Sequence, residues 1–144
     1  MEIRPMVSAH VPALAELEKQ CFSTPWSAAA LAEELENPHA VFLVACDAHT
    51  VYGYIGMHHV GDEGFITNVA VSPDARRQGI GKSLLAAAAA YGQTHALYRL
   101  TLEVRVSNAA AIALYETCGW VRDGTRPGFY RAPTEDAAIY SLYF

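Results

Sequence analysis

The segment NVAVSPDARRQGIGKSLLAAAAAYGQTH, residues 68–95, joins a strand pattern, a glycine loop and a long helix pattern in direct succession. It begins within the run 65–71, which favours a strand, and ends with residues 82–95, in which the strong helix formers Ala and Leu dominate. At the start of a helix, main-chain N–H groups lack partners within the helix, and glycines let an anion approach them closely. Arg76, Arg77 and Lys82 flank the glycines, so we expect this loop to bind a phosphate group.

Spacing separates the phosphate-binding motifs that could account for this loop. A P-loop requires glycine at the position of Arg76, and a dinucleotide-binding fingerprint requires glycine or alanine at the position of Leu84. A nucleoside triphosphatase and a hydride-transfer enzyme are therefore disfavoured. The remaining alternative is a glycine-rich helix start with solvated arginines and no ligand.

The rest of the chain places helices and strands around this segment. Helices are expected over residues 8–20, 27–36 and 108–118, with Ser27 and Asn108 as N-caps. Strands are expected over residues 41–45, 51–60, 65–71, 100–104, 120–123 and 137–143. The three strands before the glycine loop most simply form an antiparallel meander, and helix 82–95 is a crossover to strand 100–104. This order predicts an α/β fold in which helices flank both faces of a mixed, mostly antiparallel sheet.

Composition restricts the classes of function. The 144 residues suit a single domain over 1–144, and 52% hydrophobic against 17% charged residues excludes a disordered chain. A net charge of −5 argues against nucleic-acid binding. The first residues lack a signal-peptide pattern, and the longest apolar run, 84–91, is too short to span a membrane, so we expect a cytoplasmic protein without membrane contact. Cys21, Cys46 and Cys118 are far apart in sequence, and no metal site is expected.

The strand, the Arg-x-x-Gly-x-Gly loop at residues 76–81 and the long helix resemble the acyl-CoA-binding motif of the GCN5-related N-acetyltransferase (GNAT) superfamily. Residues 25–27, 68–71, 77–81 and 102–116 more narrowly resemble the ribosomal-protein-alanine N-acetyltransferase (RimI) family. That resemblance implies a GNAT fold and acetylation of the N-terminal alanine of a small-subunit ribosomal protein. The chain departs from the family pattern at Gly119-Trp120, where Gly-Phe is usual, and at Phe129-Tyr130, where two tyrosines are common.

The resemblance also implies how the cofactor is bound. The loop amides would hold the pyrophosphate of acetyl-CoA, and strand 68–71 would pair with its pantetheine arm, with coenzyme A released as co-product. The implied cofactor-binding residues are Val69, Ala70, Val71, Arg76, Arg77, Gln78, Gly79, Ile80, Gly81, Lys82 and Asn108. A bulge at Val71 would leave its main-chain N–H available to stabilise a developing oxyanion.

Acetyl transfer to an amine needs a base, because a peptide α-amine with a pKa of about 8 is largely protonated at neutral pH. Glu103, late in its strand, is the candidate base, and the alternative is a carboxylate paired with Arg105 on the same strand face. Tyr115, on the helix that follows Asn108, is the candidate acid for the departing thiolate, and the alternative is an ordinary core tyrosine. The resemblance implies both catalytic roles.

Substrate contacts are expected from Trp26, Phe129 and Tyr130, aromatic residues in or next to predicted loops that suit a groove for a peptide terminus. The expected partner is the N-terminus of a small-subunit ribosomal protein. Two alternatives remain: acetylation of lysine side chains or small amines, and a non-catalytic acyl-CoA-binding module.

Overall fold

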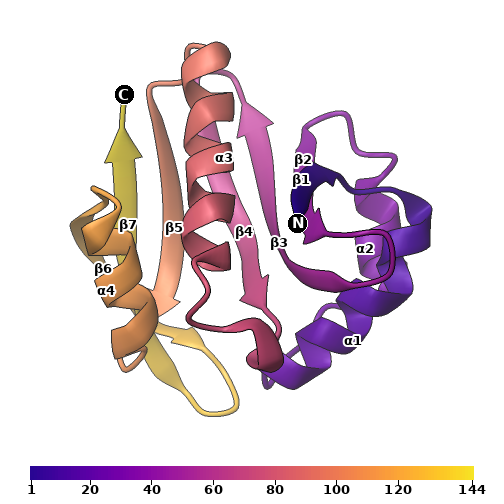
Figure 1. The fold of residues 1–144 in the computed structure, drawn as a ribbon. Helices are drawn as coiled ribbons and strands as arrows, with labels where there is room; N and C mark the ends of the chain where they lie inside the picture. The colour runs from indigo at the N-terminus through magenta and orange to yellow at the C-terminus, as the bar shows by residue number, and fades with distance from the viewer.

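A seven-stranded sheet forms the centre of the protein in the computed structural model, which describes residues 1–144 (Figure 1). The strands are β1 (Glu2–Pro5), β2 (Ala40–Cys46), β3 (Val51–Val60), β4 (Glu63–Val71), β5 (Arg99–Arg105), β6 (Val121–Tyr130) and β7 (Glu135–Tyr143), in the spatial order β1-β2-β3-β4-β5-β7-β6. Every neighbouring pair is antiparallel except β4 and β5. The predicted mixed, mostly antiparallel sheet is confirmed.

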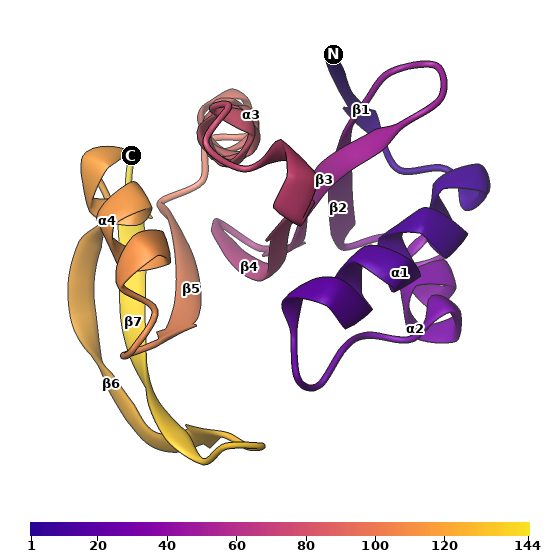
Figure 2. The same cartoon turned by 60° about the horizontal axis from the view of Figure 1, so that its bottom comes forward.

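Helices cover both faces of this sheet, as predicted (Figure 2). The α-helices are α1 (Val11–Cys21), α2 (Ala28–Glu34), α3 (Ile80–Thr94) and α4 (Ala109–Thr117), with short 3-10 turns at Ser8–His10 and Pro73–Ala75. One core lies between α1, α2 and the sheet, around Leu14, Leu31 and Tyr54. The second core, on the opposite face, brings α3 and α4 together with the sheet. None of the helices is long and apolar enough to cross a membrane.

Side-chain caps begin two of the helices where the sequence predicted them. Ser27 accepts a hydrogen bond from the Ala30 N–H at 3.1 Å, and Asn108 accepts one from the Ala111 N–H at 3.2 Å. Each cap satisfies a main-chain donor that the first helical turn leaves unpaired. Asn108 is thereby fixed at the start of α4, next to the end of β5.

The two ends of the sheet differ from the sequence prediction. Residues 2–5 form β1, and β6 extends to Tyr130 instead of ending near Asp123. Phe129 and Tyr130 therefore lie in a strand, not in a loop. Pro127 and Gly128 argue against a strand in the sequence. However, β6 is an edge strand, and the missing N–H of a proline breaks no hydrogen bond on the side of the strand that has no neighbour.

The parallel pair β4–β5 is short, so the facing edges of these two strands are unpaired over most of their length. Only residues 63–65 of β4 pair with residues 99–101 of β5. Beyond Phe65 the two strands diverge, and their lower ends are separated in Figure 1. Beyond this short pairing, the main-chain groups on the facing edges of β4 and β5 are therefore not used by the sheet.

Candidate active site

A cleft of about 410 Å³ lies where β4 and β5 diverge. Its walls come from the end of α1 and the following loop, from the facing edges of β4 and β5, from α4, and from the end of β6. The predicted site residues that line it are Trp26, Val69, Val71, Gly81, Glu103, Asn108, Tyr115 and Tyr130. Residues from distant parts of the sequence thus meet around one hollow.

The glycine loop presents a row of unpaired main-chain donors. None of the N–H groups of residues 76–82 donates a hydrogen bond within the protein, and the first bond at the start of α3 is from the Ser83 N–H to the Gly79 carbonyl, at 3.0 Å. Gly79 precedes the helix with φ of 78°, a left-handed conformation that favours glycine. A concavity of this kind at a helix N-terminus attracts anions.

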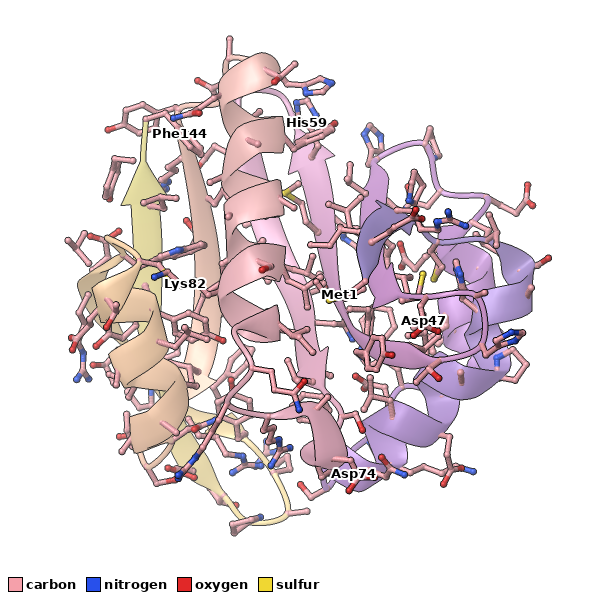
Figure 3. The ribbon with its side chains drawn as sticks, viewed as in Figure 1. Met1, Asp47, His59, Asp74, Lys82 and Phe144 are labelled. Atoms are coloured by element: carbon pink, nitrogen blue, oxygen red, sulfur yellow. The ribbon has the colours of Figure 1, made fainter.

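Side chains add positive charge around this row of donors. Arg77 and Lys82 are exposed and form no ion pair (Lys82 is labelled in Figure 3). Arg76 instead donates to the Val71 carbonyl, with its Nε at 3.4 Å. Ile80 is buried in the core beneath α3, so only its main chain faces the loop.

The edge of β4 that faces β5 exposes main-chain groups of alternate residues. Ser72 donates to the Tyr52 carbonyl of β3 at 2.7 Å, so the N–H groups of Val69 and Val71 point the other way, toward the cleft. No bulge lies at Val71, because the register shift opposite Gly56 makes Thr67 the extra residue. The Val71 N–H is unpaired because β5 has turned away, not because of a bulge.

Ala70 lies between these two valines and points in another direction. Its side chain is buried in the core beneath α1 and α2, so it does not line the cleft. Gln78 and Gly79 are exposed in the loop and also lie outside the cleft lining.

Glu103 lies on the β5 wall of the cleft, with 26% of its side chain exposed. Its carboxylate pairs with Arg126 of β6, with Oε1 at 3.1 Å from Nε. The alternative pairing with Arg105 is wrong, because the Arg105 guanidinium pairs with Glu135 at 3.2 Å. The charge of Glu103 is therefore balanced from the exposed side, and the residue still borders the cleft.

Arg105 itself holds the β6–β7 turn against β5. It donates to the carbonyls of Pro133 and Arg131, each at 2.9 Å, in addition to its bond with Glu135. Its guanidinium lies 4.5 Å from the centre of the Tyr130 ring. Arg105 thus fixes the part of β6 that reaches the cleft.

Tyr115 projects from α4 into the cleft wall with 7% of its surface exposed. Its ring packs against Trp120 and Tyr140, with centroids 6.0 and 6.3 Å away. Burial, and secondarily Tyr130, raises the pKa of Tyr115 to about 12. Its hydroxyl makes no hydrogen bond within the protein, so at neutral pH it is a protonated donor without a partner.

The three aromatic residues predicted for substrate contact do not lie together. Trp26 and Tyr130 line the cleft from opposite sides. Burial, and secondarily Glu103, raises the pKa of Tyr130 to about 12, so this hydroxyl is also protonated at neutral pH. Phe129 is 48% exposed and does not line the cleft, because neighbouring residues of a strand point to opposite sides.

Sequence reasoning did not select Glu18 and Asn68, two buried polar residues that line the cleft. Glu18 accepts the Trp26 main-chain N–H at 2.9 Å and the Tyr54 hydroxyl at 2.7 Å, which ties the loop after α1 to β3. A signal existed for each residue: a carboxylate within the apolar face of a helix and an amide within an apolar strand. Both patterns place a polar group where burial costs free energy unless the group is hydrogen-bonded, so each residue calls for an identified partner.

Comparisons with known proteins agree with this geometry. The sequence model of the Acetyltransferase (GNAT) family matches residues 11–120. The chain is 36% identical over 129 residues to N-alpha-acetyltransferase RimI of Mycobacterium tuberculosis, covering 85% of this chain and 80% of that protein. It is 33% identical over 144 residues to the ribosomal protein bS18-alanine N-acetyltransferase of Escherichia coli, covering 97% and 95%.

A solved structure gives the same result. The crystal structure of the ribosomal-protein-S18-alanine N-acetyltransferase from Escherichia coli superposes with a TM-score of 0.91 at 31% identity, covering 99% of this chain and 92% of that one. The family match spans most of the chain, including the glycine loop, Glu103 and Tyr115. The chain therefore belongs to the GNAT acetyltransferase family and is an acetyl-CoA-dependent N-acetyltransferase.

Proposed function

We propose that this enzyme acetylates the α-amine of an N-terminal alanine on a small-subunit ribosomal protein. The observation that carries the proposal is that Glu103 and the unpartnered Tyr115 hydroxyl border one cleft, beside a loop whose N–H groups are unpaired. The Escherichia coli relative named for ribosomal protein bS18-alanine supports this acceptor.

The residues at the start of α3 fit the cofactor that the family uses. The unpaired donors of residues 76–82, with Arg77 and Lys82, suit a diphosphate, and the Val69 and Val71 main-chain groups suit the amides of a pantetheine arm. Asn108 borders the cleft from the start of α4. When bound, acetyl-CoA supplies the acetyl group as a reactive thioester.

Glu103 acts as the general base. The amine must lose a proton before its lone pair can form a bond to the carbonyl carbon, and the Glu103 carboxylate takes that proton, directly or through one water. As the carbon–nitrogen bond forms, the carbonyl oxygen gains negative charge. The Val71 N–H, which points into the cleft, stabilises that oxygen.

Tyr115 acts as the general acid. When the carbon–sulfur bond breaks, its electron pair stays on the sulfur of coenzyme A, and the Tyr115 hydroxyl gives that sulfur a proton. The nitrogen, positively charged once it is bonded to carbon, loses its second proton as the intermediate collapses, and the Tyr115 oxygen takes that proton back. The products are the N-acetylated chain and the free thiol. Transfer is direct, because Cys21, the cysteine that lines the cleft, has no histidine beside it there to activate it.

The test compares two synthetic peptides with purified enzyme and acetyl-CoA. One begins with a free alanine and contains no lysine, and the other has a blocked N-terminus and one lysine. We expect a mass increase of about 42 Da, an acetyl group, on the first peptide only. Acetylation of the lysine peptide alone would contradict the proposal and favour side-chain amines.

A further inference from the structure

Asn68 carries an unmet hydrogen-bonding requirement that the mechanism above does not use. The residue is 6% exposed, and its Oδ1 is the single buried side-chain oxygen or nitrogen in the 144 residues without a hydrogen-bond partner. Buried polar atoms are nearly always paired, so an orphaned one calls for an explanation. Asn68 also lines the cleft, so the missing donor can arrive with a ligand.

The fold itself offers Oδ1 no donor. The Asn68 amide lies beside the Tyr54 hydroxyl, but that hydroxyl has one proton, which it donates to Glu18 Oε2 at 2.7 Å. That proton is used in the bond to Glu18, and a hydroxyl has no second proton to give to Oδ1. Exchanging the oxygen and nitrogen of the amide would bring Oδ1 next to the Tyr54 oxygen, which has no free proton to donate to it. The orphan is therefore a property of the arrangement and not of one amide orientation.

The position of Asn68 indicates which ligand brings the donor. Asn68 and Ala70 point to the same face of β4, the face covered by α1 and α2, whereas the glycine loop and α3 lie on the other face. The cleft wall on the Asn68 side is formed by residues 21–26, which include Trp26. The acceptor, not the cofactor, is expected along that wall.

We propose that Asn68 binds the attacking amine, with Oδ1 accepting one of its N–H bonds while Glu103, from β5, receives the proton that leaves. This assignment rests on the proposed function. The Asn68 amide lies beside the Tyr54 hydroxyl, which donates to Glu18, and Glu18 also accepts the Trp26 main-chain N–H. With one N–H held by Oδ1 and one proton transferred to Glu103, the nitrogen keeps its remaining N–H and carries the lone pair that attacks the thioester.

The primary test is Asn68→Leu, which is nearly isosteric and removes the acceptor oxygen. With saturating acetyl-CoA and the alanine peptide, kcat/KM for the peptide is expected to fall about 10- to 100-fold, the effect of losing a hydrogen bond to a charged group. The Kd of acetyl-CoA, measured by calorimetry, is expected to stay the same. Ser141→Ala, which removes a buried hydroxyl bonded to Thr101 at 3.1 Å outside the cleft, is the matched control and should leave kcat/KM unchanged.

Three results would overturn the assignment. The first is an unchanged kcat/KM for the peptide in folded Asn68→Leu. The second is a loss of acetyl-CoA affinity as large as the loss of kcat/KM, because Asn68 would then bind the cofactor and not the acceptor. The third result concerns an acceptor in which an ester replaces the first peptide bond. The second residue of this acceptor has no main-chain N–H, whereas its terminal amine is unchanged. If Asn68→Leu has no effect with that acceptor, Oδ1 binds the backbone N–H and not the amine.

Failure of the proposed acceptor is distinguishable from failure of this inference. If the wild-type enzyme does not acetylate the alanine peptide, the comparison is made with the primary amine that it does acetylate, because every primary amine carries the same N–H groups. If Asn68→Leu does not fold, a crystal structure of the wild-type chain with coenzyme A and acceptor decides. An acceptor nitrogen about 3 Å from Oδ1 supports the assignment, and a water in that place overturns it.

Discussion

Replacing Tyr115 by Phe is expected to remove catalysis while leaving the fold intact. The hydroxyl has no partner in the protein, and the ring packing against Trp120 and Tyr140 is the same for Phe. No hydrogen bond is lost, so the free energy of unfolding should change by less than about 0.5 kcal/mol. Loss of a general acid should lower kcat by about 10²- to 10⁴-fold. A thiol reagent that reports coenzyme A release at saturating substrates measures kcat.

Tyr140→Phe is the matched control, and its expected pattern is the reverse. The Tyr140 hydroxyl donates to Glu116 at 2.9 Å, away from the cleft. Its loss should lower the free energy of unfolding by about 1 kcal/mol, or Tm by about 3 °C, without changing kcat. If folded Tyr115→Phe keeps kcat within about twofold of the wild type, Tyr115 is not the acid.

The same substitution has a consequence for alkaline stability. The pKa of Tyr115 is about 12 in the folded chain, against about 10 for an unfolded tyrosine. Because the folded pKa is raised, the neutral phenol contributes fully below pH 10, and the contribution is lost as the pH rises from 10 through 12. Two pKa units correspond to roughly 3 kcal/mol. Urea unfolding from pH 9 to pH 12 should therefore show a smaller loss of stability for Tyr115→Phe than for the wild type, and equal losses would contradict the burial argument.

Three further substitutions test other parts of the site. Glu103→Gln should lower kcat by about 10²- to 10⁴-fold and alter its pH dependence while the Kd of acetyl-CoA stays constant, and a pH–rate profile identical to wild type would reject Glu103 as base. Arg105→Gln releases the β6–β7 turn and the Tyr130 ring, so the KM for the peptide should rise severalfold while the Kd of acetyl-CoA does not; steady-state kinetics and calorimetry separate the two. Gly79→Ala places an alanine at φ of 78°, which costs about 1–2 kcal/mol of backbone strain. Calorimetry should therefore show that acetyl-CoA binding is weakened about tenfold. An unchanged affinity would mean that the diphosphate binds elsewhere.

Most of the fold was predictable because its signals are local. Ser27 and Asn108 cap helices within their own turns, the apolar run 41–45 lies within β2, and the run 51–60 coincides with β3. The two strands that sequence reasoning missed or shortened, β1 and β6, both contain proline, which normally argues against a strand. Pro5 and Pro127 are tolerated because β1 and β6 are the two edges of the sheet, and edge position depends on the whole topology.

Site geometry was less predictable because its contacts join distant strands. The rule that residues two apart share a strand face favours an Arg105 partner for Glu103. The structure pairs Glu103 with Arg126 through the β5–β7–β6 register, while the β6–β7 turn and Glu135 engage Arg105. Register over three strands could not be read from one sequence. The glycine loop, in contrast, is contiguous, so its unpaired donors were predictable from spacing alone.

The single parallel pair explains why the predicted chemistry meets in one place. β4 ends at Val71 and leads into the glycine loop, while Glu103 lies late in β5, after the α3 crossover. Because β4 and β5 are parallel, their carboxyl ends lie at the same edge of the sheet, and ligands bind at such edges. If β5 were antiparallel to β4, Glu103 would lie near the start of β4, far from the glycine loop. Glu103 and the loop could then not contact the same thioester substrate. Divergence of the two strands after Phe65 then opens the space between them, so the crossover places Glu103 on the same side of the sheet as the glycine loop, and the short pairing leaves the cleft between β4 and β5.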